Sequence, residues 1–228
     1  MSARERLFER LWRALGRGGS GGPEELRREV EQRIADPRPH LVPARAKVAG
    51  EERIALFVRM AKAVGTEIER VGHIGEVGEA VMRFLRFHNL PRQVRLAPDP
   101  LLDLAGFEGH ALLEVRRGTA SADDPTGVTV AEAGVAETGT LVLASSPERP
   151  TMLAYLPENC VVVLPIARLD GSYEESWQRI RERFGRPPRS VNLVTGPSRT
   201  ADIGLQLTMG AHGPRRLLVV LVDRTDSA

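Results

Sequence analysis

Apolar residues along this chain fall into two patterns, short continuous runs and runs with a helical period. The runs CVVVLP (160–165) and LLVVLV (217–222) are typical of strands in a sheet whose two faces are both covered. Residues 51–64 repeat apolar positions at spacings of three and four, which predicts an amphipathic helix. On the same grounds helices are expected over 3–15, 23–35, 76–89 and 173–184, and strands over 66–71, 93–98, 110–118, 127–131, 140–144 and 191–194.

Strands and helices alternate over most of the chain, and this order predicts an α/β fold. Because its apolar strands need cover on both faces, we expect a three-layer α/β/α architecture around a mostly parallel sheet. Ligands of such sheets bind at the carboxyl ends of the strands.

The first 22 residues differ from the rest and are expected to form a separate arm. One face of the helix over 3–15 carries five apolar side chains (Leu7, Phe8, Leu11, Trp12 and Leu15), and arginines outnumber glutamates around it. The glycine-rich segment 16–22 has the composition of a flexible linker. We therefore divide the chain into an arm (1–22) and a main domain (23–228). The arm helix either docks on a partner chain or an anionic surface, or packs on its own body or a dimer mate.

Composition narrows the class of protein. The chain has 228 residues, 42% hydrophobic and 27% charged, with a formal charge of +2, as in an ordinary globular protein. No nucleic-acid-binding motif, transmembrane segment or secretory signal is recognisable, so we expect a cytoplasmic protein that binds no nucleic acid. The single cysteine, Cys160, lies in an apolar run and cannot by itself hold an iron–sulfur cluster.

Residues 195–213, TGPSRTADIGLQLTMGAHG, are the most informative stretch. A strand over 191–194 runs into Gly196-Pro197-Ser198, a helix is expected to follow as far as Gly210, and the strand 217–222 comes next. This order predicts that the two strands pair in parallel. A helix that begins at Ser198 would point free N–H groups at a phosphate or carboxylate, with Arg199 and Thr200 beside it. The alternative is a tight turn and a capped helix without a ligand.

A second small-residue turn is formed by Thr138, Gly139 and Thr140. Its N–H groups and hydroxyls could hold an anion, or the threonines could bond their own backbone at a turn that requires glycine. Glu132 and Glu137 come shortly before this turn, and Arg149 follows the strand 140–144.

Three more residues near the carboxyl-terminal strand are candidates for the same site. Asp202 could pair with an arginine or bind a hydroxyl or amine of the ligand. His212, followed by Gly213, is the candidate acid–base group because histidine titrates near neutral pH. A histidine that bonds a backbone carbonyl at a turn is the alternative. We expect the three glycine-containing segments to converge on one pocket at the carboxyl edge of the sheet.

Three segments together resemble a known family. AEAGVAETGTLVL (131–143), GPSRTADI (196–203) and GAHGPRRLLVVLVD (210–223), in this order and spacing, are similar to the LUD domain, and more closely to the lactate-utilisation protein C type. One position departs from the pattern, because Gly204 stands where the motif usually has glutamate.

The resemblance implies a fold of the NagB/RpiA/CoA-transferase type and a role in oxidising L-lactate to pyruvate. In such systems iron–sulfur clusters belong to partner proteins, so this chain is expected to need no cofactor of its own and to bind a small carboxylate or phosphate or to support those partners. A homodimer is a further expectation. The alternative is a stand-alone enzyme of the CoA-transferase, sugar-phosphate isomerase or folate cyclo-ligase type, in which Glu137 would be the nucleophile. No lysine-bearing phosphate loop is present in the sequence.

Overall fold

A computed structural model describes residues 2–15, 23–36, 41–200, 208–210 and 213–226. Contacts divide the chain into two units, Met1–Leu41 and Val42–Ala228. The boundary after residue 22 stays a prediction, and the expected linker lies outside the described residues.

The first unit contains two of the expected helices, α1 (Ala3–Ala14) and α2 (Pro23–Ala35). Ser2 caps α1 because its hydroxyl accepts from the N–H of Glu5 and the Glu5 carboxylate accepts from the N–H of Ser2. No residue of α1 is buried, and its apolar face stays open to solvent.

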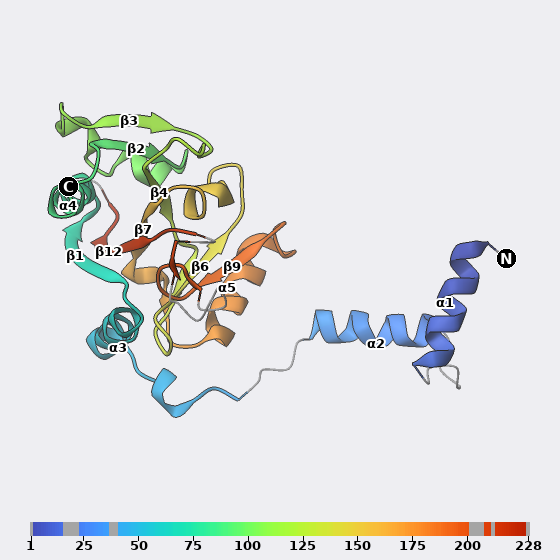
Figure 1. The fold of residues 1–228 in the computed structure, drawn as a ribbon. Helices are drawn as coiled ribbons and strands as arrows, with labels where there is room; N and C mark the ends of the chain where they lie inside the picture. The colour runs from blue at the N-terminus through green and yellow to red at the C-terminus, as the bar shows by residue number, and fades with distance from the viewer. Residues whose placement is uncertain (1, 16–22, 37–40, 201–207, 211–212, 227–228) are drawn as a thin grey trace. The chain divides into compact units, whose positions relative to one another are not determined.

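The second unit is built on a six-stranded sheet in its described part (Figure 1). In spatial order the strands are β1 (Glu67–His73), β12 (Arg216–Arg224), β7 (Asn159–Pro165), β4 (Thr126–Val130), β2 (Gln93–Leu96) and β3 (Glu114–Arg117). Every neighbouring pair in this sheet is parallel. The predicted α/β class with a mostly parallel sheet is confirmed.

Alternate residues of the central strands enter cores on opposite faces of the sheet. In β12, Val220 packs into the core that includes α4 (Val77–Phe87), whereas Val219 packs into the core that includes α3 (Gly50–Ala63). Burying a side chain of this size stabilises the fold by about 1.5–3 kcal/mol. Both faces are therefore covered, as the continuous apolar runs predict.

A second sheet adds to the cover on the α3 face. Its strands, in spatial order, are β8 (Leu169–Asp170), β5 (Ala133–Val135), β6 (Thr140–Ala144) and β9 (Val191–Val194). Helix α5 (Tyr173–Phe184) packs on this small sheet through the stripe of Tyr173, Trp177, Ile180 and Phe184, which belongs to the core. Short 3₁₀ turns complete the unit at Ala44–Ala46, Ile74–Glu76, Pro100–Asp103, Phe107–Gly109, Thr151–Ala154 and Ile166–Arg168.

The expected parallel pairing of 191–194 with 217–222 is wrong. Strand β9 runs antiparallel to β6 in the small sheet, whereas β12 lies between β1 and β7 in the large one. The period-2 and continuous patterns identify a strand but do not specify its partner, which here is set by the tertiary packing.

The expected helix is wrong at both of its ends. These are two short antiparallel strands, β10 (Arg199–Thr200) and β11 (Thr208–Met209), whereas residues 201–207 lie outside the described ranges. The backbone of Ser198 joins this arrangement, because its N–H donates to the Pro214 carbonyl and its own carbonyl accepts from the N–H of Gly210. Ser198 is therefore not the cap of a helix, because a strand follows it directly.

Candidate functional site

The direction of the connections in the six-stranded sheet reverses between the neighbouring strands β2 and β4. The next strand of this sheet after β2 is β3 on one side, and the next after β4 is β7 on the other side (Figure 1). In parallel α/β sheets, ligands bind outside the carboxyl ends of two such strands. The residues that follow β2 and β4 are thus the first place to look for a site.

Charged side chains gather at that edge. Asp99 follows β2, Glu132 follows β4, and Arg149 bridges them: its Nε lies 2.5 Å from Asp99 Oδ2 and its Nη1 lies 2.6 Å from Glu132 Oε2. All three residues are buried, with exposed fractions of 6% or less. Buried charges need partners, and these three supply them to one another.

Two further arginines complete the cluster. Arg183 of α5 also donates to the Glu132 carboxylate. Arg168, which follows β7, donates from Nη1 to the Ala131 carbonyl at 3.0 Å and has no carboxylate partner among the described residues. Burial lowers the pKa of Arg168, and the positive charges of Arg149 and Arg183 lower it further, whereas the carboxylates of Glu132 and Asp99 oppose this shift only in part. A negative charge placed beside Arg168 would therefore be stabilised.

Arg149, Arg168 and Arg183 all line one hollow with a volume of about 470 Å³, which we call the arginine pocket. Its lining consists of Asp99, Pro100, Leu101, Leu104, Glu148, Arg149, Arg168 and Arg183. Guanidinium groups bind carboxylates and phosphates through two parallel hydrogen bonds, whereas the leucines and the proline offer apolar contact. The pocket can thus hold a small organic anion. The described residues contain no group of three or more metal-ligating side chains.

The residues predicted from the motifs lie elsewhere, at the amino ends of the sheet's strands. The Thr138–Thr140 turn and the 195–199 segment both lie at the carboxyl end of α3, where the chain enters β1: a Cβ at Gly139 would overlap the backbone of Ala61, and one at Gly196 would press on Val64. Gly213 lies against Ser198 just before β12. The segments do come together, but the predicted carboxyl-edge location is wrong.

Hydroxyl groups hold the two motif segments together. Thr140 Oγ1 lies 2.7 Å from Thr138 Oγ1, 2.9 Å from the Tyr173 hydroxyl and 2.7 Å from Thr195 Oγ1. The hydroxyls thus bond to one another, and a Cβ at Gly139 would overlap the backbone of Ala61. Both observations favour a structural turn that requires glycine. The ligand-binding roles of Thr138, Gly139, Thr140 and Gly196 stay predictions.

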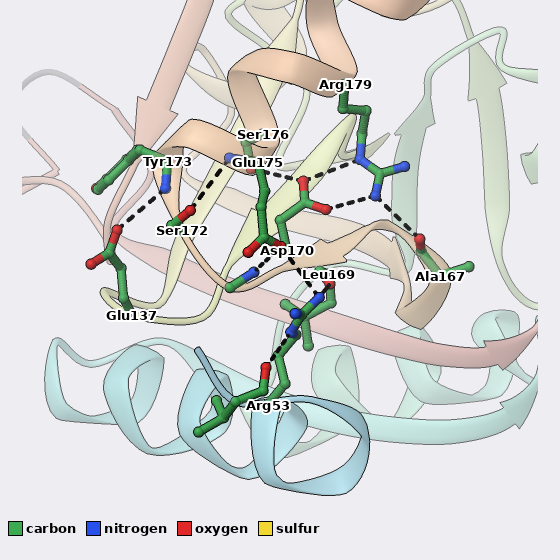
Figure 2. A network of polar contacts seen from close by, with 12 residues as sticks. Arg53, Glu137, Ala167, Leu169, Asp170, Ser172, Tyr173, Glu175, Ser176 and Arg179 are labelled. Carbon is green, nitrogen blue, oxygen red and sulfur yellow. Dashed lines mark hydrogen bonds and ion pairs between the residues drawn. The ribbon is translucent and has the colours of Figure 1, made fainter. Parts of the chain in front are cut away.

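Glu137 lies at the amino end of α5. Its carboxylate accepts from the N–H of Tyr173 at 3.2 Å. Ser172, the residue immediately before α5, caps the helix because its hydroxyl accepts from the N–H of Glu175 (Figure 2). Glu137 is only 5% exposed. A nucleophile must reach its substrate, so this geometry favours a structural role that stabilises the helix terminus.

The remaining predicted residues divide into two groups. The exposed Arg199 lies over Gly65, and in strand β10 it pairs with Met209 of β11, whereas Thr200 pairs with Thr208. Asp202 and His212, as well as Gly204, lie outside the described residues, so their roles stay predictions.

A second hollow borders the motif segments through Gly210 and Gly213. Its described lining includes the carboxylates of Asp123, Asp124 and Glu158, and these would repel an anion. Burial works against the charge of Asp124, but hydrogen bonds from Arg95 and Ser121 outweigh burial and hold the pKa of this carboxyl low. The arginine pocket is therefore the better anion site.

The sequence patterns do not single out Asp99, Arg168 or Arg183. They place Glu132 only beside the motif turn, and Arg149 at the carboxyl end of the strand 140–144. A signal was present, because Asp99, Glu132 and Arg168 each follow a buried strand by two or three residues. Carboxyl ends of parallel strands meet at one edge. What the sequence did not provide was the order of the strands.

The topology defines an α/β protein built on a parallel sheet. A comparison with known families makes this more specific. The chain belongs to the LUD domain family, whose match covers residues 54–222. The family identified from the three motifs is confirmed.

Curated relatives match part of the chain. An uncharacterized protein of Neisseria meningitidis serogroup B is 36% identical over 96 residues, which are 42% of this chain and 41% of that protein. Lactate utilization protein C of Exiguobacterium sp. is 35% identical over 99 residues, 42% of this chain and 43% of that protein. The corresponding protein of Bacillus subtilis is 32% identical over 100 residues, 42% of each. The matches thus span about two fifths of these relatives.

The fold is similar to a solved structure as well. The crystal structure of a DUF162 family protein from Deinococcus radiodurans superposes with a TM-score of 0.59 and 22% identity, covering 77% of this chain and 99% of that one. At this identity the likeness shows a shared fold.

Proposed function

We propose that this chain is a component of a lactate-utilisation system that oxidises L-lactate to pyruvate, and that it binds a small anionic ligand at the arginine pocket. Its membership of the LUD family and its similarity to proteins named lactate utilization protein C support the first part. The arginine pocket supports the second part.

The observation that carries the ligand-binding role is the position of Arg168. Its guanidinium group lies at the carboxyl edge of the sheet, near Arg149 and Arg183. It forms no ion pair with a carboxylate of the described residues, although the charges of Glu132 and Asp99 offset part of the repulsion from the two arginines. Such a cation is stabilised when an anion binds beside it.

Electron transfer in this proposal belongs to iron–sulfur partner proteins. Cys160 is the one cysteine of these 228 residues, and it is buried in β7, where burial raises the pKa of its thiol to about 12. A protonated, enclosed thiol is a poor metal ligand. The chain would act beside these partners in the cytoplasm. No helix in the described ranges is long and apolar enough to cross a membrane.

Growth on L-lactate as the sole carbon source tests the proposed system. A strain that lacks this chain should fail to grow on L-lactate and grow normally on pyruvate, and the full chain supplied on a plasmid should restore growth. Affinity purification of the tagged chain should bring down iron–sulfur proteins. Normal growth of the deletion strain on L-lactate would contradict the proposal.

A further inference from the structure

We infer that the arginine pocket takes a small monocarboxylate whose carboxylate group binds Arg168, and that Glu132 is a positioning residue that holds Arg149 and Arg183 beside it. This inference rests on the proposed function, since it names the class of ligand and the residues that select it.

The geometry of Arg168 favours a planar ligand group. Its Nη1 is engaged with the Ala131 carbonyl, whereas Nε and Nη2 have no partner among the described residues. These two nitrogens form one side of the guanidinium fork, whose spacing matches the two oxygens of a carboxylate. Arg168 can therefore bind a carboxylate bidentately without breaking its bond to the backbone.

The charges of the pocket select against a second negative charge. Arg149, Arg168 and Arg183 face the carboxylates of Asp99 and Glu132, and the exposed Glu148 lies at the rim. The cluster thus carries as many negative as positive groups when all are ionised. One added carboxylate is held by the free side of Arg168, but a dianion brings a second charge that meets Asp99, Glu132 and Glu148.

The wall of the pocket favours a short apolar substituent. Pro100, Leu101 and Leu104 line it, and Leu104 is 46% exposed. A ligand with a methyl-sized group beside its carboxylate would cover part of this apolar surface. An inorganic anion has no apolar group and would leave this apolar surface exposed to solvent.

Glu132 acts through two arginines rather than on the ligand. Its carboxylate, 2% exposed, accepts from Arg149 and also from Arg183 of α5. This shared bond sets the position of two positive charges and cancels one of them. Replacing Glu132 by glutamine removes that negative charge, so the pocket should then accept a dianion more readily.

Titration calorimetry and thermal unfolding of the full chain test this inference, with pyruvate, L-lactate, malonate and inorganic phosphate as the probes. The wild-type chain should bind pyruvate and L-lactate more tightly than malonate and phosphate. Arg168→Gln should weaken binding of the monocarboxylates about tenfold or more, because a charge-assisted bidentate contact is lost. Arg168→Lys, which keeps the charge but not the fork, should restore part of the affinity.

Arg216→Gln is the matched control, because Arg216 is a part-buried arginine that donates to Asn159 Oδ1 near the amino end of β12. This variant should bind like the wild type. Glu132→Gln should shift the preference toward malonate and phosphate, a change in selectivity that a loss of packing alone would not produce.

Three results would overturn parts of the account, and they differ from one another. If a folded Arg168→Gln variant bound the ligand with wild-type affinity, the ligand would not bind in this pocket. Tighter binding of phosphate than of pyruvate by the wild-type chain would contradict the class of ligand. Absence of binding of all four anions to the wild-type chain would contradict the proposed ligand-binding function itself.

Discussion

Arg149 joins the ends of two parallel strands through two buried ion pairs, to Asp99 and to Glu132. A buried pair stabilises little compared with an apolar pair, but one that loses a partner leaves an uncompensated charge. Substitutions in this chain should therefore reduce stability most where they leave a buried charge unpaired or force a side chain against the backbone.

Arg149→Ala should lower the free energy of unfolding by about 3–5 kcal/mol, because it leaves the carboxylates of Asp99 and Glu132 buried with less compensation. Urea unfolding followed by circular dichroism measures this change. The control is Arg116→Ala, which removes an exposed arginine of the edge strand β3 and should change stability by no more than about 0.5 kcal/mol. Equal effects of the two substitutions would contradict the role of the buried cluster.

Gly139→Ala should destabilise the fold by about 2–4 kcal/mol, since Gly139 has a φ of +67° and a Cβ there would overlap the backbone of α3. Gly109, an exposed glycine with open space around its Cα, is the matched position, and Gly109→Ala should be close to neutral. Chemical denaturation of both variants measures the two changes in the free energy of unfolding. A neutral Gly139→Ala would show that the turn does not press on α3.

At the scale of elements, periodicity was a good guide to helices and strands but a poor guide to pairing. The apolar stripe of α5 and the continuous runs of β7 and β12 were predicted correctly because burial itself sets those patterns. The segment after Ser198 was not, because its strand β10 is only two residues long and pairs with β11, a strand of equal length further along the chain. The antiparallel pairing of β9 with β6 likewise has no local signal.

Ile180→Ala should detach α5 from the small sheet and lower the free energy of unfolding by about 2–5 kcal/mol, because Ile180 is 1% exposed in a small cluster. Gln178→Ala, on the exposed side of the same helix, should change stability by no more than about 0.5 kcal/mol. Thermal unfolding compares the two. Similar losses in both variants would mean that helix propensity, not packing, sets the stability of α5.

Removal of residues 1–22 should leave the unfolding of the remaining chain unchanged within about 1 °C, a shift that corresponds to roughly 0.3 kcal/mol at this size. The physical reason is that no residue of α1 is buried and that Leu7 and Leu15 are 58% and 64% exposed. Differential scanning calorimetry of the full and shortened chains measures the shift. A drop of several degrees would show that the arm packs on the main unit.

At the scale of the whole molecule, two groups of residues occupy opposite ends of one parallel sheet. The motif segments around Thr138 and Ser198 meet where the strands begin, and the arginine pocket lies where they end. The family was recognisable from the motifs because the order and spacing of three segments can be read directly from the sequence. The pocket was not predictable in the same way, since Asp99, Arg149 and Arg168 become neighbours only through the strand order.

The decisive experiment records backbone amide chemical shifts of the full chain while pyruvate is added. We expect the largest changes at the carboxyl edge, around Asp99, Glu132, Arg149 and Arg168, and little change around Thr138 and Ser198. Changes concentrated at Thr138 and Ser198 would contradict this prediction, because the ligand would then bind where the strands begin.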